Sequence, residues 1–210
     1  MRPIQARRGA GGIGPIRMDY VNQEIDPLTR LPGCGAFLER LGDETARAER
    51  YGRNLSLLLA DVDGWAALTA ARGSETGDAI LCHLALVFLS SVRDTDTVAR
   101  IGRDKFAILL PDTDGQGART QAERLAAAVG RADVGEDGEG VPLRVSVSVG
   151  VAVFGPGLAE DAALLSHAEE ALRDAKRRRR DVAPPDQSSG ASIREFAQNG
   201  GLAAPGDGRS

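Results

Sequence analysis

Ile101-Gly-Arg-Asp-Lys-Phe106 lies between two short apolar runs and decides the fold. Residues 97–101 before it and 106–110 after it have the composition of β-strands. Gly102 opens a tight turn, so the two runs are predicted to form a hairpin. The tip, 102–105, places one carboxylate and two cations where the strands open to solvent. Such a tip fits a nucleotide site or a damaged one.

Composition fits one domain of a cytoplasmic protein. The chain has 210 residues, of which 42% are hydrophobic, and a net charge of −4, which gives no general attraction to nucleic acid or membranes. Cys34 and Cys82 are far apart and are predicted to be reduced thiols. The longest apolar stretch, 80–92, is shorter than the roughly 20 residues that span a bilayer. We therefore expect neither a nucleic-acid nor a membrane partner.

Three segments are expected along the chain. Residues 1–20 are rich in Gly, Arg and Pro, which predicts a disordered basic leader. Residues 182–210 are rich in Gly, Ser, Pro and Ala, which predicts a disordered tail. The folded domain is therefore expected to cover 21–181.

Helical and strand patterns alternate within this domain. Hydrophobic spacing predicts helices over 35–52, 65–71, 74–92, 116–129 and 160–180, and strands over 55–60, 97–101, 106–110 and 143–154. This order predicts an α/β sandwich of the ferredoxin-like or polymerase-palm kind, with a central antiparallel hairpin in a mixed sheet flanked by helices. In the long helix the expected core residues are Ile80, Leu81, Leu84, Val87 and Leu89.

Asp61 and Asp63 follow a nearly continuous apolar strand. In the predicted fold, the end of this strand is a neighbour of the hairpin tip, so Asp61 and Asp104 are expected to converge. Paired carboxylates suit Mg²⁺, which takes oxygen ligands. The ordinary alternative is that these are polar residues that end a strand.

Three further signals each have a plain structural alternative. Asp78, near the start of a helix, fits a local N-cap role as well as a ligand role. The cations from Lys176 to Arg180 fit a solvated helix end that complements the helix dipole. Arg93 and Asp96 fit a surface ion pair.

Together, however, the motifs match one family in order and spacing. The chain resembles the GGDEF family of diguanylate cyclase domains over residues 22–181. The resemblance rests on Asp26-Pro-Leu-Thr-Arg-Leu-Pro32, Leu58-Leu-Ala-Asp-Val-Asp63, Gly77-Asp78, Ala99-Arg-Ile-Gly-Arg-Asp-Lys-Phe106, Val147-Ser-Val-Gly150 and Asp174-Ala-Lys176.

The resemblance implies an activity and a set of site residues. Active members pair two subunits, each with GTP and Mg²⁺, and join the two GTP molecules into cyclic di-GMP, a bacterial second messenger. By this resemblance Asp61, the Val62 carbonyl and Asp104 would bind the metal, and Asp104 would be the catalytic carboxylate. The residues expected to contact GTP are Asp78, Thr69, Gly102, Lys176 and Arg180.

The chain departs from the family pattern around this site. Arg103 replaces the second signature glycine and is expected to strain the turn, because a tight hairpin often needs positive φ there. Lys105 replaces an acid. Ala66 and Thr69 stand where a lysine and an asparagine are usual, and Gly33 replaces another asparagine.

Arg93 and Asp96 match the spacing of the family's product site, which binds cyclic di-GMP. We therefore interpret the chain as a degenerate GGDEF domain that is catalytically impaired and acts as a cyclic di-GMP receptor toward an unknown protein partner. Two alternatives remain open. One is a weakly active cyclase that binds GTP and Mg²⁺ as a homodimer, and the other is an interaction module that binds no nucleotide.

Overall fold

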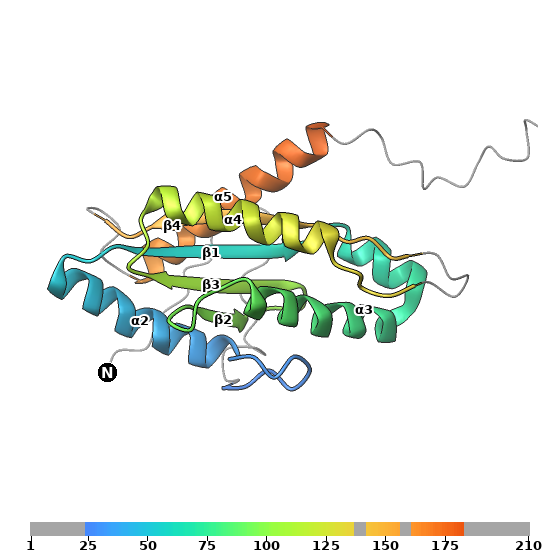
Figure 1. Ribbon diagram of the computed structural model, residues 1–210, viewed down its shortest axis with the longest axis horizontal. Helices are drawn as coiled ribbons and strands as arrows, with labels where there is room; N and C mark the ends of the chain where they lie inside the picture. Colours follow the sequence, from blue (N-terminus) through green and yellow to red (C-terminus); the bar gives the residue numbers. More distant parts are fainter. Residues whose placement is uncertain (1–23, 137–141, 156–160, 183–210) are drawn as a thin grey trace, which may run out of the picture.

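The computed structural model describes residues 24–136, 142–155 and 161–182 (Figure 1). A four-stranded sheet carries helices on both faces. The leader 1–20 and the tail, except Val182, lie outside the described residues. The elements are α2 (Cys34–Tyr51), β1 (Leu55–Val62), α3 (Trp65–Ser90), β2 (Thr97–Arg100), β3 (Lys105–Pro111), α4 (Gly115–Arg131), β4 (Val147–Val153) and α5 (Asp161–Val182).

The strands run in the order β2-β3-β1-β4, and every neighbouring pair is antiparallel. The predicted α/β sandwich with a central hairpin is confirmed, but the expected mixed sheet is wrong for these four strands. Each helical connection joins parallel strands that are not neighbours. β3 separates β1 from β2, and β1 separates β3 from β4, so no parallel pair is hydrogen-bonded.

The sheet separates two apolar cores. All eight residues of β1 are buried, as expected of a strand covered on both faces. Because side chains alternate along a strand, Leu58 and Ala60 face α3 and α4, whereas Leu57 and Leu59 face α2 and α5. The continuous apolar run of β1 is thus explained by two cores rather than one.

α3 combines the two predicted helices. Trp65–Ser90 is one helical run interrupted at Gly73, whose φ of 83° and ψ of 166° are not helical. The break supports the prediction of two segments, 65–71 and 74–92. The inward position assigned to Leu89 is wrong, because Leu89 is 48% exposed. Phe88 fills that part of the core, with its ring 5.0 Å from the ring of Phe106.

β4 is shorter than its alternating pattern. The predicted strand 143–154 is observed only over Val147–Val153, because its partner β1 ends at Val62, which pairs with Val147. Within the described ranges, none of the helices is both long and apolar enough to cross a membrane.

α5 lies unusually close to β4 at Gly150. A Cβ atom there would stand 2.3 Å from the backbone N of Leu172 and 2.4 Å from the carbonyl O of Ala168. Only glycine leaves room for this approach. Lys176, about one helical turn beyond Leu172, is thereby placed above the end of β1.

Candidate functional site

The hairpin tip has an ordinary backbone. Ile101 N donates to Lys105 O at 3.0 Å and closes the turn. Arg103 is not among the described non-glycine residues with positive φ, so the strain expected at this position is absent. Its side chain is exposed to solvent. Replacing glycine by arginine therefore changes the charge and bulk of the tip rather than its backbone geometry.

The carboxyl end of β1 and the hairpin tip come together, as the topology predicts. Asp61 lies opposite Lys105 in the β1–β3 pairing, and Val62 N donates to Asp104 O at 3.1 Å. The Asp61 carboxylate is buried and close enough to Asp104 for repulsion. Burial, and then the charge of Asp104, raises the pKa of Asp61 above its usual value, against the opposing effect of Lys176.

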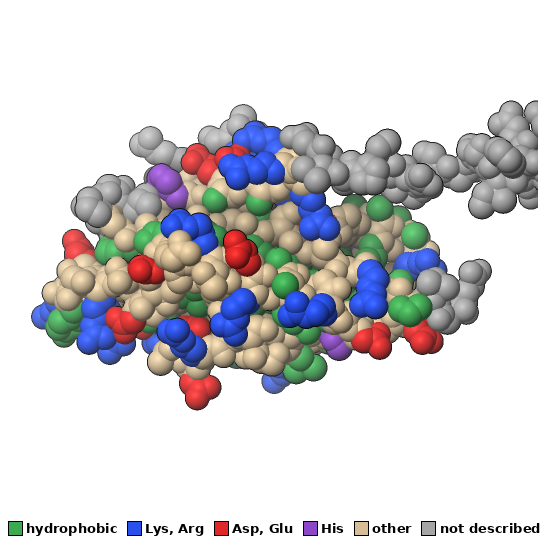
Figure 2. All heavy atoms as spheres, turned by 45° about the horizontal axis from the view of Figure 1, so that its top comes forward, with side chains coloured by type: hydrophobic (Ala, Val, Ile, Leu, Met, Phe, Trp, Pro, Cys, Tyr) green, Lys and Arg blue, Asp and Glu red, His purple; other side chains and the backbone are tan. Residues whose placement is uncertain are grey.

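α5 supplies two cations to this end of the sheet. Lys176 Nζ donates to Asp61 Oδ1, and Arg179 Nε lies 3.2 Å from Asp63 Oδ2. Figure 2 shows Lys and Arg side chains gathered on α5. The run 176–180 is thus more than a solvated helix end. The side chain of Arg180, expected to contact a phosphate, lies outside the described residues.

Both carboxylate oxygens of Asp63 accept hydrogen bonds from residues that the sequence did not predict as its neighbours. Ser146 Oγ and Ser148 Oγ donate to its two carboxylate oxygens at 2.8 and 2.6 Å. Its backbone N also donates to Ser146 O at 2.9 Å. The sequence signal for these contacts was the spacing of Ser146, just before β4, and Ser148, within it, which places both side chains on the same side. Asp63 therefore fastens β1, β4 and α5 together.

The residues expected to contact a base lie beside the break in α3. Thr69 Oγ1 donates to Trp65 O at 2.9 Å, so its hydroxyl hydrogen is committed to its own helix. Gly77, the residue before Asp78, packs against Thr69 and Trp65 across this break. Asp78 lies inside α3 with an exposed side chain. It comes five residues after the break at Gly73, so it is not at the N-cap of the second helical segment.

The fit to Mg²⁺ is mixed. Asp61, Asp104 and the Val62 carbonyl are oxygen donors of the kind Mg²⁺ uses alongside nucleotide phosphates. In the part of the chain that the structure describes, however, no three His, Cys, Asp or Glu side chains group to hold a metal. Lys176 already binds Asp61, and Lys105 stands opposite it. The oxygen donors therefore suit Mg²⁺, but the two neighbouring lysines repel a metal cation and compete with it for Asp61.

Arg93 and Asp96 form a tight turn at the other end of β2. Asp96 Oδ2 accepts from Arg93 N at 2.9 Å, and Asp96 N donates to Arg93 O at 3.0 Å. The expected surface ion pair is therefore absent, because the backbone of Arg93 rather than its guanidinium meets the carboxylate. The exposed guanidinium makes no hydrogen bond or ion pair with any described residue.

An open groove of about 440 Å³ lies between the end of α3 and α4, and one of its lining residues, Ser91, comes two residues before Arg93. Gln121 Nε2 donates to Ser91 O at 2.7 Å and joins the two helices there. The groove also contains Arg124 and Arg131. The sequence gives no signal for them, because arginines on an exposed helix face carry no distinguishing pattern. Its lining residues are Ser90, Ser91, Thr120, Glu123, Arg124, Ala127, Ala128 and Arg131.

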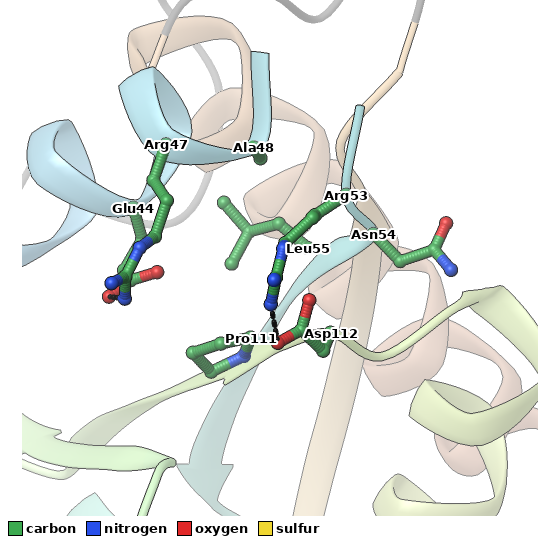
Figure 3. A pocket seen from close by; sticks show the side chains of 8 residues that line it. All are labelled: Glu44, Arg47, Ala48, Arg53, Asn54, Leu55, Pro111 and Asp112. Carbon is green, nitrogen blue, oxygen red and sulfur yellow. Dashed lines mark hydrogen bonds and ion pairs between the residues drawn. The ribbon is translucent and has the colours of Figure 1, made fainter. Parts of the chain in front are cut away.

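A second hollow lies at the opposite end of β1 from Asp61. It is lined by α2, the start of β1 and the end of β3, and an exposed Arg53–Asp112 ion pair of 2.9 Å closes one side (Figure 3). Its volume of about 20 Å³ has room for about one water molecule. This hollow is too small for a nucleotide.

The family model described as "Diguanylate cyclase, GGDEF domain" matches residues 23–182. The diguanylate cyclase DgcP of Pseudomonas aeruginosa is 36% identical over 156 residues, which are 74% of this chain and 23% of that protein. DosC of Escherichia coli is likewise 36% identical over 156 residues, 74% of this chain and 34% of its own length. The chain thus spans about a quarter to a third of these relatives.

Solved structures agree with the sequence relatives. Diguanylate cyclase SiaD of Pseudomonas aeruginosa, in complex with its activator SiaC, has a TM-score of 0.69 at 33% identity, covering 77% of this chain and 60% of that one. The GGDEF domain of DgcB from Caulobacter crescentus, in complex with c-di-GMP, has a TM-score of 0.69 at 25% identity, covering 74% and 91%. On its sequence and on its fold, this chain belongs to the GGDEF family of diguanylate cyclase domains.

Proposed function

We propose that this chain is a cyclic di-GMP receptor or regulator whose capacity for synthesis is impaired. The observation that carries the proposal is the exposed guanidinium of Arg93, which no described residue engages. Arg93 follows Ser91 by two residues, and Ser91 lines an open groove that contains two further arginines. Arginine suits a guanine edge and a phosphate, because its planar fork pairs with both. Asp96 Oδ2 accepts from Arg93 N, and its Oδ1 accepts only a long bond of 3.5 Å from the exposed Thr95 hydroxyl, which a guanine donor can replace.

Impaired synthesis is supported by the other end of the sheet. Lys105 and Lys176 surround the carboxylate that the family uses for Mg²⁺, and the Thr69 hydroxyl is bonded to its own helix. Loss of one transition-state contact can lower a rate by roughly 10²- to 10³-fold. Several lost transition-state contacts at one site would together lower the rate of synthesis strongly. Ligand binding is then the function that the retained residues support best.

Titration calorimetry with cyclic di-GMP tests the receptor function. We expect saturable heat from the intact chain and a loss of affinity of about tenfold or more in Arg93→Ala, since a charged hydrogen bond contributes roughly 1.5–3 kcal/mol. Arg50→Ala is the matched control, because Arg50 lies on α2, across the sheet from the groove, and stacks on Tyr51. Absence of heat, or equal affinity in Arg93→Ala, would contradict the proposal and favour a module that binds no nucleotide.

Residual cyclase activity is the second candidate, favoured by the proximity of Asp61 and Asp104. Incubation with GTP and Mg²⁺ or Mn²⁺, followed by chromatography of the products, separates the two functions. We expect no cyclic di-GMP from the chain as it stands. Any product that disappears in Asp104→Ala would establish the enzyme instead.

A protein partner completes the proposed signalling role. The relative SiaD forms a complex with an activator protein, and a receptor without synthesis needs an output. Pull-down with and without cyclic di-GMP is expected to retain a partner in one state only. If equal amounts of the partner are recovered with and without cyclic di-GMP, partner binding does not depend on the ligand, and the proposed signalling role is contradicted.

A further inference from the structure

The outer face of α3 carries exposed apolar side chains. Leu86 and Leu89 are 66% and 48% exposed, and they follow Cys82 at the i+4 and i+7 positions of one helical face. We call residues 82, 86 and 89 the α3 stripe. The side of the same helix that carries Leu84 and Phe88 packs into the core, so the α3 stripe points away from the sheet.

The turn 24–33 already contacts the α3 stripe. Cys82 Sγ donates to Leu28 O at 3.5 Å, and Leu28 packs against the core cluster to which α3 belongs. Of the four large hydrophobic residues exposed in the described part of the chain, three lie in this turn or on the stripe: Ile25, Leu86 and Leu89. A single exposed leucine needs no explanation, whereas this concentration indicates a contact surface.

The helical segment that carries the stripe is acidic. Residues 74–90 contain the exposed Glu75 and Asp78 but no Lys or Arg. Residues 1–20, which precede the turn, contain four arginines and one acid, Asp19. Because the two segments have opposite net charge, electrostatic attraction favours their approach.

Residues 13–21 add apolar side chains to this positive charge. Five of these nine residues are large and apolar, namely Ile13, Ile16, Met18, Tyr20 and Val21. Two residues separate the segment from Glu24, where the turn begins. A chain spans up to about 3.3–3.6 Å per residue, and Cys82 and Leu89 are about 10 Å apart along the helix. The segment is therefore long enough to reach both leucines from the turn.

We propose that residues 13–21 dock on the α3 stripe of the same chain and cover Leu86 and Leu89. The apolar side chains of the segment bury the two leucines, and Arg17 is attracted by the acidic start of the helical segment. The docking involves no nucleotide, so it does not depend on cyclic di-GMP binding at Arg93.

Limited digestion of the full chain with trypsin, followed by mass spectrometry, tests the docking. Trypsin cuts after Arg8 and after Arg17, so cleavage at Arg8, outside the docked segment, is an internal reference. A docked segment is cut only during the fraction of time in which it is released. The double variant Leu86→Ser with Leu89→Ser should therefore raise cleavage at Arg17, relative to Arg8, about tenfold.

Tyr51→Ser is the matched control. Tyr51 is also large and is 63% exposed, but it lies on α2, which packs on the opposite face of the sheet. This change should leave the ratio of the two cleavage rates as it is in the parent chain. Circular dichroism establishes that the double variant is folded, and Leu86→Ser alone replaces it if it is not.

Two results would overturn the proposal. The first is an equal ratio of cleavage at Arg17 to cleavage at Arg8 in the parent chain and in the folded variant. The second comes from analytical ultracentrifugation of both proteins. If the parent chain is a dimer and the double variant a monomer, the α3 stripe binds a second copy of the chain rather than residues 13–21.

Discussion

The carboxylate of Asp26 and the guanidinium of Arg100, 74 positions apart in the chain, form a buried ion pair with Arg100 Nη1 3.1 Å from both carboxylate oxygens. Arg100 Nη2 also donates to Arg103 O at 2.7 Å. Thr29 N and Thr29 Oγ1 donate to Asp26 Oδ1, each at 2.7 Å. This single guanidinium therefore joins the turn before α2 to the tip that carries the candidate site.

Breaking this pair from one side should destabilise the fold. Arg100→Met leaves Asp26 buried with its charge uncompensated, which typically costs about 3–5 kcal/mol. Urea unfolding followed by circular dichroism measures the loss. The double variant Asp26→Asn with Arg100→Met should lose less than the sum of the two single changes. Additive losses would show that the two side chains are not coupled.

The same pair predicts how stability depends on pH. Burial alone would raise the pKa of Asp26, but the hydrogen bonds from Thr29 and Arg100 outweigh it, so the folded pKa is lowered. The pair therefore contributes its full stability above the unfolded pKa of about 3.8 and loses it as pH falls through the lower folded pKa. The difference in unfolding free energy between the parent chain and Asp26→Asn should shrink below about pH 4. A constant difference down to pH 2 would contradict this assignment.

Gly150 sets the distance between β4 and α5. Because an added Cβ would meet the backbone of α5 at 2.3 Å, Gly150→Ala should push the helix away and cost about 1–3 kcal/mol or more. Gly130→Ala in α4 is the matched control, since nothing lies within 4 Å of its Cβ. That change should stabilise the helix by up to about 1 kcal/mol. Thermal unfolding of both variants tests the contrast, and equal shifts would refute it.

The two cysteines should differ in reactivity. Cys34 is fully buried, and desolvation raises the pKa of its thiol to about 11, so little thiolate forms near neutral pH. Cys82 is half-buried on α3 and donates weakly to Leu28 O at 3.5 Å. Iodoacetamide at neutral pH should label Cys82 in the folded chain and both residues after unfolding. Rapid labelling of Cys34 in the folded chain would contradict its buried position.

Local sequence patterns were sufficient to predict the helices and strands. Contacts between residues distant in the chain could be found only in the structure. The helical spacing in 35–52 and the apolar run 55–60 predicted α2 and β1 within two residues, because each element must bury its own apolar face. The convergence of Asp61 with Asp104 followed from topology. By contrast, the pairing of Asp26 with Arg100 depends on how the turn 24–33 packs on β2, for which the sequence offers no periodic signal.

Two errors have a shared physical cause. Leu89 was assigned to the core from its hydrophobicity, but the helix face that meets the sheet there is occupied by Phe88. Arg103 was assigned backbone strain from its place in a glycine-rich signature, but this turn needs no positive φ at that position. In both cases the residue type was known, and the orientation of its backbone was not.

If synthesis is impaired as proposed, restoring the residues of the family pattern should raise synthesis above that of the parent chain. Arg103→Gly and Lys105→Glu return the tip to the family pattern, while Ala66→Lys and Thr69→Asn return two positions on α3. Each restored contact can raise the rate by roughly 10²- to 10³-fold, so the fourfold variant should form cyclic di-GMP from GTP and Mg²⁺ at a level that chromatography detects. Adding Asp104→Ala to that variant should remove the product again. If the parent chain forms product as fast as the fourfold variant, the four departures do not impair the site, and the chain is an ordinary cyclase domain.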